Sequence, residues 1–223
     1  MVPDWLPWLL QVNDSQFPSG AYAHSMGLEE LVQRGVVKKA EDLETFLHRQ
    51  IIPSLLAFEL PFLIQMHAAS AAGDLKTVRS LDDELEAWKL AAELRQASRQ
   101  IGSRRLSLIR KLETDPLLES YAMSDAPCHH LTVCALELRR LPVEASMCAF
   151  AMQTISGYAI SAMKLIRLGQ ERCQLIIRHS MSTLTPRIAS LTATPPKRIG
   201  WFNPLHEIAS MRHARANERL FIS

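Results

Sequence analysis

Three adjacent residues, Cys128, His129 and His130, carry the side chains of this chain best suited to bind a metal ion. Thiolate and imidazole groups are preferred ligands of late transition metals. Successive residues of a helix point about 100° apart, so the three would bind one ion only from a loop, which Pro127 permits. We therefore expect a structural role for these residues, with a metal site as the alternative.

Four arginines could act on a nucleotide bound to a partner, because one guanidinium can accelerate phosphoryl transfer by several orders of magnitude. They are Arg95, Arg99, Arg104 and Arg105. A solvated helix face that pairs with Glu93 and its neighbours is the preferred interpretation. The chain itself contains no GxxxxGKS/T, GxSxG, HExxH or GxGxxG motif, so we expect a protein that is not an enzyme.

The C-terminal segment combines two histidines with an apolar end. His206 and His213 are seven residues apart and share one helix face, but they are too distant to bind one ion, so we interpret them as surface or partner-facing residues. Residues 219–222 (RLFI) are too apolar for a free end. We expect this tail to fold onto a partner and to be disordered in the isolated chain. The alternative is that Leu220 and Phe221 pack back on their own domain.

The elements that position these groups begin with residues 17–29 (FPSGAYAHSMGLE). Pro18 fixes its own φ and Gly20 tolerates a positive φ, so the chain can turn sharply here. A helix from Tyr22 would then place Tyr22, Ser25 and Glu29 on one face, with His24 on the neighbouring stripe. We expect this turn and helix to present polar groups on one side.

Composition predicts an all-α protein. The chain has 223 residues, 48% hydrophobic, with 8 glycines and 6% aromatics, which suits one helical domain with a substantial core. A net charge of +2 gives no reason to expect nucleic acid binding. The four cysteines form no CxxC pair, the N-terminus does not resemble a secretory signal, and no apolar run reaches the ~18 residues of a membrane span. We expect a cytoplasmic protein with reduced thiols and no membrane contact.

Glycine and proline divide the chain into a single-domain bundle of roughly nine or ten helices. We expect helix ends at Gly35 and at Gly73-Asp74, and a kink between residues 57 and 61 caused by Pro61. Residues 75–112 predict one long helix or two joined helices, in which Gly102 allows close backbone packing. The small, apolar residues 143–168 predict the centre of the bundle. Residues 181–200 predict a short helix followed by a loop, and Asn203-Pro204 begins the last helix.

Four segments, in order along the chain, resemble the UreF family of urease accessory proteins. They are residues 17–29, residues 93–106 (ELRQASRQIGSRRL), residues 165–170 (LIRLGQ) and residues 204–223, with PLHEIASMRH and RLFIS. The first matches every fixed position of the family signature, approximately F/L-P-x-G-G/S-F/Y-x-H/Y-S-x-G-L-E. The chain departs from the family pattern at Glu207, Ala214, Arg167 and the run from Pro127 to His130.

The resemblance implies an all-helical homodimer, residues 1–223 forming one domain and residues 203–223 a C-terminal helix and tail that bind a partner. It implies a non-catalytic scaffold or gate that links UreD (UreH in some systems) to the GTPase UreG and modulates GTP hydrolysis. The assembly delivers nickel to the urease apoprotein, so no cofactor is expected to bind stably and nickel is expected only in transit. The alternatives are a direct nickel-binding chaperone that uses Cys128, His129 and His130, and a helical adaptor unrelated to urease.

The family motifs also name residues for two kinds of contact. The candidates for partner binding are Pro18, Gly20, Tyr22, His24, Ser25, Gly27, Glu29, Met211, Arg212, His213, Arg219, Leu220 and Phe221. The candidates for the dimer interface or for internal packing are Glu93, Arg95, Ser98, Gln100 and Gly102.

Overall fold

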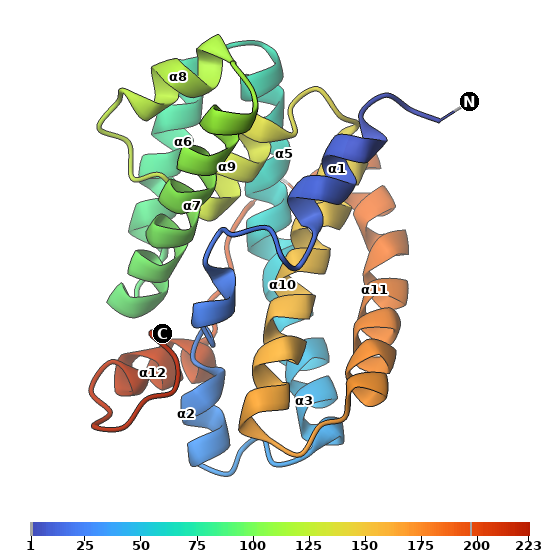
Figure 1. The fold of residues 1–223 in the computed structure, drawn as a ribbon, viewed down its shortest axis with the longest axis vertical. Helices are drawn as coiled ribbons and strands as arrows, with labels where there is room; N and C mark the ends of the chain where they lie inside the picture. Colours follow the sequence, from blue (N-terminus) through green and yellow to red (C-terminus); the bar gives the residue numbers. More distant parts are fainter. Residues whose placement is uncertain (1, 197) are drawn as a thin grey trace.

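Helix α10 (Val143–Leu165) runs through the middle of the molecule, and the other long helices pack around it (Figure 1). The structure is a computed structural model that describes residues 2–196 and 198–223. Over these residues it contains ten continuous helices and no strand, which confirms the all-α prediction. In chain order the elements are α1 (Leu6–Asn13), η1 (Ala21–Ala23), α2 (Leu28–Gln33), α3 (Ala40–Phe46), η2 (Leu47–Ile51), α4 (Ile52–Ser54), η3 (Leu55–Glu59), α5 (Leu60–Ala71), α6 (Leu75–Trp88), α7 (Ala92–Leu112), α8 (Pro116–Ala122), α9 (His130–Glu137), α10, α11 (Gln170–Ala193) and α12 (Pro204–His213).

The central position of α10 follows from its small side chains. Ala151, Ala159 and Ala162 are completely buried, and small residues allow neighbouring helices to approach closely. Helix α10 packs against α11 over most of its length and also contacts α2, α5 and α9. The prediction that residues 143–168 form the centre of the bundle is therefore confirmed.

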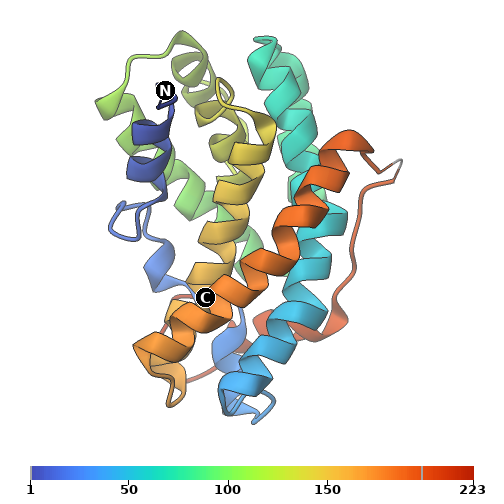
Figure 2. The ribbon, with the colours of Figure 1, turned by 90° about the vertical axis from the view of Figure 1, so that its right-hand side faces the viewer.

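The segments α3, η2, α4, η3 and α5 form one continuous helix, in which η2 and η3 are π-helical turns. Pro53 and Pro61 each remove a backbone donor, and the two π-helical turns lie immediately before them. The backbone N–H of Gly200 donates to the carbonyl of Ala57, 3.0 Å away, which Pro61 leaves without its α-helical donor. Where a kink was expected between residues 57 and 61, the structure has the π-helical turn η3, and the bond from Gly200 anchors the segment that leads to α12 (Figure 2).

This continuous helix, Ala40–Ala71, also corrects the expectation about apolar runs. Its 32 residues are long and apolar enough to span a membrane by length and composition, with a mean hydropathy of 1.4 in the best window. However, 61% of that window is buried inside the protein. The helix therefore has the pattern of a core helix.

Glycine and the helix caps behave as predicted at several positions. Gly35 and Gly73 have positive φ at helix ends, and the Asp74 side chain caps α6 by accepting from Thr77 N–H. A Cβ at Gly102 would overlap the backbone of Cys128 and His129. The close packing expected at Gly102 is therefore made, against the segment that leads into α9.

The helix expected from Tyr22 does not form. Only the short 3₁₀ turn η1 follows the Pro18–Gly20 turn, and α2 begins at Leu28. Met26 and Gly27 have φ values of 52° and 81°, which an α-helix cannot contain. The N–H groups of Ser25 and Met26 donate to the carbonyl of Ser223 instead of an earlier turn. This distant partner overrides the local helical spacing.

The prediction of a short helix and a loop over residues 181–200 was right about the loop, which follows Ala193, but wrong about the length of the helix. Helix α11 continues to Ala193 with Pro186 inside it. Leu184 and Ile188 are buried on either side of this proline, so packing against the bundle holds the helix together. Helix α11 ends at Ala193, shortly before Pro195 and Pro196, because two successive prolines cannot continue a helix.

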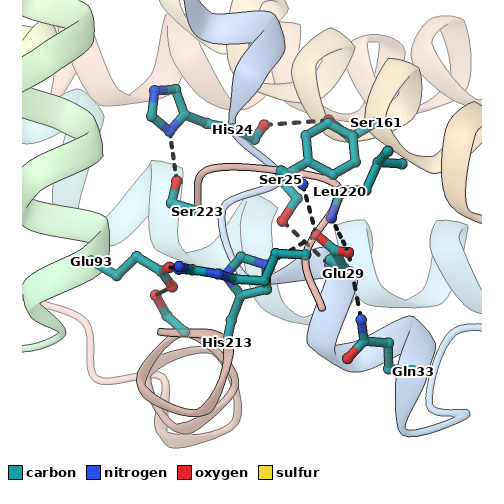
Figure 3. Close-up of polar contacts among 12 residues, drawn as sticks. His24, Ser25, Glu29, Gln33, Glu93, Ser161, His213, Leu220 and Ser223 are labelled. Carbon is teal, nitrogen blue, oxygen red and sulfur yellow. Dashed lines mark hydrogen bonds and ion pairs between the residues drawn. The ribbon is translucent and has the colours of Figure 1, made fainter. Parts of the chain in front are cut away.

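Helix α12 begins as predicted, since the side chain of Asn203 accepts from His206 N–H at 3.2 Å. The tail after α12 returns to its own domain, and Phe221 is 5% exposed. The expected disorder of this tail is therefore not seen. Its anchor is the signature segment near the N-terminus, as Figure 3 shows.

Candidate functional site

Three of the four motif segments meet at one place, between α2, α7 and α12 (Figure 3). Glu29 comes from α2, Glu93 from α7 and His213 from the end of α12. We call these three side chains, together with tail residues 219–223, the clasp. Its parts are separated by up to almost the whole length of the chain, so only the complete fold can assemble it.

His213 is the centre of the clasp. Its Nδ1 lies 2.9 Å from Glu93 Oε1 and its Nε2 lies 3.0 Å from Glu29 Oε2, and the side chain is completely buried. The ring of His213 thus has a carboxylate at each nitrogen, and the two glutamates together fix its orientation. Ser210 donates a further hydrogen bond to Glu93, and Arg219 lies 3.6 Å from it. The two carboxylates are therefore compensated although they are buried.

Glu29 holds the tail through the peptide backbone. Its Oε1 accepts from Leu220 N–H at 2.8 Å and its Oε2 accepts from Phe221 N–H at 3.0 Å. Burial alone would raise the pKa of Glu29, but the hydrogen bonds from Leu220, His213 and Phe221 outweigh burial and lower the pKa. The carboxylate is thus ionised at neutral pH, as these contacts require.

The signature segment contacts the end of the tail, at Ile222 and Ser223. His24 Nδ1 lies 2.7 Å from Ser223 Oγ, and Ile222 N–H donates to the Ala23 carbonyl at 2.9 Å. Ser161 on α10 donates to the His24 carbonyl at 3.4 Å. Burial, and then the nearby charge of Arg104, lower the pKa of His24, so this imidazole is neutral at pH 7. The signature segment therefore holds the tail rather than forming a free polar face.

The predicted partner-binding residues separate into a buried and an exposed set. His24, Ser25, Glu29, His213 and Phe221 are buried, and Gly20 and Gly27 have the positive φ that the signature turns require. The expectation that His213 faces the surface or a partner was wrong, because both nitrogens face carboxylates inside the chain. The exposed set consists of Pro18, Tyr22, Met211, Arg212, Arg219 and Leu220.

An apolar stripe lies on the outer side of the clasp. Leu205, Ile208 and Met211 project from one face of α12 and are 41%, 48% and 46% exposed. Sequence reasoning named only Met211 among them, although the three-residue spacing is visible in the sequence. Leu220 and Ile222 of the tail are also exposed. The clasp therefore fixes a helix whose outer face is apolar and uncovered in the isolated chain.

The motif residues of α7 serve internal contacts at most positions. Glu93 is part of the clasp, Ser98 lies 3.0 Å from His129 Nδ1, and Arg95 donates to the Lys89 carbonyl. Gly102 packs against backbone, as described above. Gln100 is exposed. Of this group, Gln100 is the residue best placed to meet a second molecule.

The contacts of the four arginines within the chain show which of them could act on a nucleotide bound to a partner. Arg105 is 1% exposed and pairs with Glu137 at 2.6 Å, so it cannot reach a nucleotide on another protein. Arg95 and Arg99 both pair with Glu86, as the salt-bridged interpretation expected in kind. Arg104 is exposed and lies beside Gly20 and His24. It is the arginine of the four that borders the signature segment.

Cys128, His129 and His130 lie at the start of α9, the first two in the loop before it. His129 Nε2 faces Glu86 at 2.9 Å, and burial lowers the pKa of His129 and of His130 to about 3. Burial also raises the pKa of the Cys128 thiol to about 12. The nearby Asp82 was missed from the sequence: it is fully buried and accepts from Tyr121 Oη at 2.6 Å and Cys128 N–H at 2.8 Å. These contacts give the segment a structural role.

A cavity of about 950 Å³ extends behind the signature segment, between α7 and α10. Its lining includes His24, His130 and Asn203, each of which has a buried nitrogen with no hydrogen-bond partner among the described residues. Tyr158 and His206 also line the cavity, and Tyr158 Oη lies 3.1 Å from His206 Nε2. The cavity can therefore hold water or another polar guest.

The fold and the clasp define an all-helical protein in which a C-terminal tail completes an N-terminal signature segment. The family model for UreF matches residues 37–181. The chain is 30% identical over 221 residues to the urease accessory protein UreF of Bacillus sp. (strain TB-90), covering 96% of this chain and 97% of that protein. It is 29% identical to the UreF of Paenarthrobacter aurescens, covering 96% of each chain, and 28% identical to that of Actinobacillus pleuropneumoniae, covering 96% and 97%. The chain belongs to the UreF family of urease accessory proteins and so has a role in urease maturation.

Proposed function

We propose that this chain is a non-catalytic scaffold that links a UreD protein to the GTPase UreG while nickel is delivered to apo-urease. The observation that carries the proposal is the apolar stripe of Leu205, Ile208 and Met211, held outward by the buried clasp. An exposed apolar helix face that is rigidly positioned is suited to bind a partner protein. We assign this stripe, with the exposed tail residues Leu220 and Ile222, to UreD.

The contact with UreG would use a different surface, across a homodimer of this chain. Arg104 is the candidate for an effect on GTP hydrolysis, because it is exposed beside the signature segment whereas Arg105 is buried in an ion pair. Both the dimer and the GTPase rest on the resemblance to the family. Nickel is cargo in this proposal, and the nitrogens of His24, His130 and Asn203 that lack a partner among the described residues, in a mostly apolar cavity, suit its transient passage.

Substitution on the stripe tests the proposal directly. Ile208→Asp places a charge at the middle of the stripe, and we expect it to weaken binding of the cognate UreD at least tenfold, because a buried unpaired carboxylate would have to be desolvated. Binding is measured by light scattering and by titration of purified UreD. Deleting residues 204–223 is a weaker test, since it also removes the clasp.

Leu175→Asp is the matched control. Leu175 projects from α11 and is 52% exposed, close to the 48% of Ile208, but it lies on a different helix. Both variants should keep the wild-type helix content and Tm. Equal binding of UreD by wild type and by the Ile208→Asp variant would refute the assignment of this surface.

A further inference from the structure

Two helices that are distant in the sequence bring Glu44, His48 and His179 together on the surface of the bundle. Glu44 lies on α3, His48 on the π-helical turn η2, and His179 on α11. One possible ligand atom of each residue lies within 4.8 Å of those of the other two. We call these three residues the α3/α11 cluster. Among residues 2–196 and 198–223, it is the one group of three His, Cys, Asp or Glu side chains whose possible ligand atoms lie this close together.

The carboxylate of the cluster is oriented from outside it. Arg172 on α11 lies 3.2 Å from Glu44 Oε2, so that the other oxygen, Oε1, faces His179 Nδ1 at 2.5 Å. Arg172 also lies 3.5 Å from Glu41. In metal sites, ligating carboxylates are usually fixed by such a second hydrogen bond. The arginine therefore positions one carboxylate oxygen toward the histidines.

His48 supplies an unused ligand. Its ring lies 5.0 Å from the His179 ring between centroids, and its buried Nε2 has no hydrogen-bond partner among the described residues. Burial, and then the neighbouring His179, lower the pKa of His48, so its imidazole is neutral at pH 7. A neutral imidazole binds a metal without first losing a proton. A buried nitrogen without a partner is a cost that a bound ion would remove.

We propose that Glu44, His48 and His179 bind one divalent transition-metal ion, with water at the remaining positions. One carboxylate and two imidazoles suit zinc, nickel or copper, and three protein ligands leave a position open. The possible ligand atoms now lie within 4.8 Å of one another. In a tetrahedral site with bonds near 2.0 Å the ligand atoms are ~3.3 Å apart, so small side-chain movements would bring them into position. The ion replaces the hydrogen bond between Glu44 and His179. The site lies on other elements than the clasp and does not depend on the proposed UreD contact.

Titration of the full-length chain with Zn²⁺ and Ni²⁺, after chelator treatment, tests the site. Isothermal titration calorimetry should give one ion per chain, and the double variant with His48→Ala and His179→Ala should bind at least tenfold more weakly. Co²⁺ provides a second readout, because its visible absorption changes when imidazole replaces water. Because His179 is exposed, the single His179→Ala variant should keep its fold and still show the loss.

Two variants serve as controls. Glu41→Gln removes a carboxylate from the same helix and near the same arginine, but outside the cluster, and should bind within twofold of wild type. Cys128→Ser should also leave binding unchanged. The proposal is overturned if wild type binds no ion, if the double variant binds as tightly as wild type, or if Cys128→Ser removes the binding.

Discussion

The clasp and the α3/α11 cluster both pair histidine with glutamate at 3.0 Å or less. They differ in how many of their nitrogen and oxygen atoms have a hydrogen-bond partner. In the clasp, both nitrogens of His213 face carboxylates, and Glu29 also accepts two backbone N–H groups. In the cluster, His179 has one carboxylate partner and is 60% exposed, and the buried Nε2 of His48 has no hydrogen-bond partner in the described part of the chain.

This difference indicates two uses for the same side chains. A buried charge that is fully paired is costly to disturb and fixes one arrangement of the chain. A half-exposed group with spare ligand capacity contributes little to stability and remains able to bind something else. The clasp is therefore a structural site that organises a surface, whereas the cluster is suited to bind an ion.

The largest expected effect is that of Glu29→Ala. The substitution leaves His213 with one carboxylate and leaves the Leu220 and Phe221 N–H groups without an acceptor, so we expect a loss of about 3 kcal/mol in the free energy of unfolding. Urea denaturation measures this loss, and limited proteolysis should show cleavage after residue 213.

Glu30→Gln is the control for this prediction. Glu30 is also buried, but it pairs with Arg34, which is 57% exposed, and its loss should cost less than about 1 kcal/mol. Equal effects of the two substitutions would show that the clasp is no more important than an ordinary helix-surface pair.

Acid should act on His48 and on Glu29 in different pH windows. The pKa of His48 is lowered by burial and by His179, so its neutral form stabilises the fold above the unfolded pKa of about 6.5, and this contribution falls as pH drops below that value. The pKa of Glu29 is lowered by its hydrogen bonds, so its contribution persists until the pH falls below about 4.3. Each group changes stability by at most ~1.4 kcal/mol per pH unit.

NMR can follow both windows in one sample. The His48 ring signals should titrate below pH 6.5, while the amides of Leu220 and Phe221 stay protected from hydrogen exchange at pH 5. Loss of amide protection together with the His48 titration would contradict the separate windows.

The smallest expected effect is that of His179→Ala in the metal-free protein. The exposed ion pair with Glu44 should contribute less than about 0.5 kcal/mol to stability. Thermal and urea denaturation measure this value. A loss as large as that of Glu29→Ala would place the cluster among the structural sites and remove the contrast.

Features with local causes could be predicted from the sequence. The ends at Gly35, Gly73 and Asn203 depend on residues within a few positions, and the packing at Gly102 on the absence of one carbon atom. The helix expected from Tyr22 failed because Ser25 and Met26 bond to Ser223, and no local pattern reports a partner so distant. The continuation of α11 past Pro186 likewise depends on burial of its neighbours.

The sequence identified the residues of the candidate site but not the contacts between them. The motifs identified Glu29, Glu93 and His213, yet their spacing gives no sign that one histidine lies between both carboxylates. The tail was assigned to a partner because an apolar end needs a cover, and the structure provides that cover within the chain for Phe221. The α3/α11 cluster was missed, since only the i and i+4 spacing of Glu44 and His48 is visible without the fold.

The bond between Ser25 and Ser223 also has a consequence for biosynthesis. Residues near the beginning of the chain cannot reach their final conformation until residue 223 has been added. At ~5–20 residues per second this delay is roughly 10–40 s after Ser25 is made, and longer while the ribosomal tunnel still holds the tail. A partner protein that binds the signature segment in this conformation can therefore bind it only after residue 223 has been made.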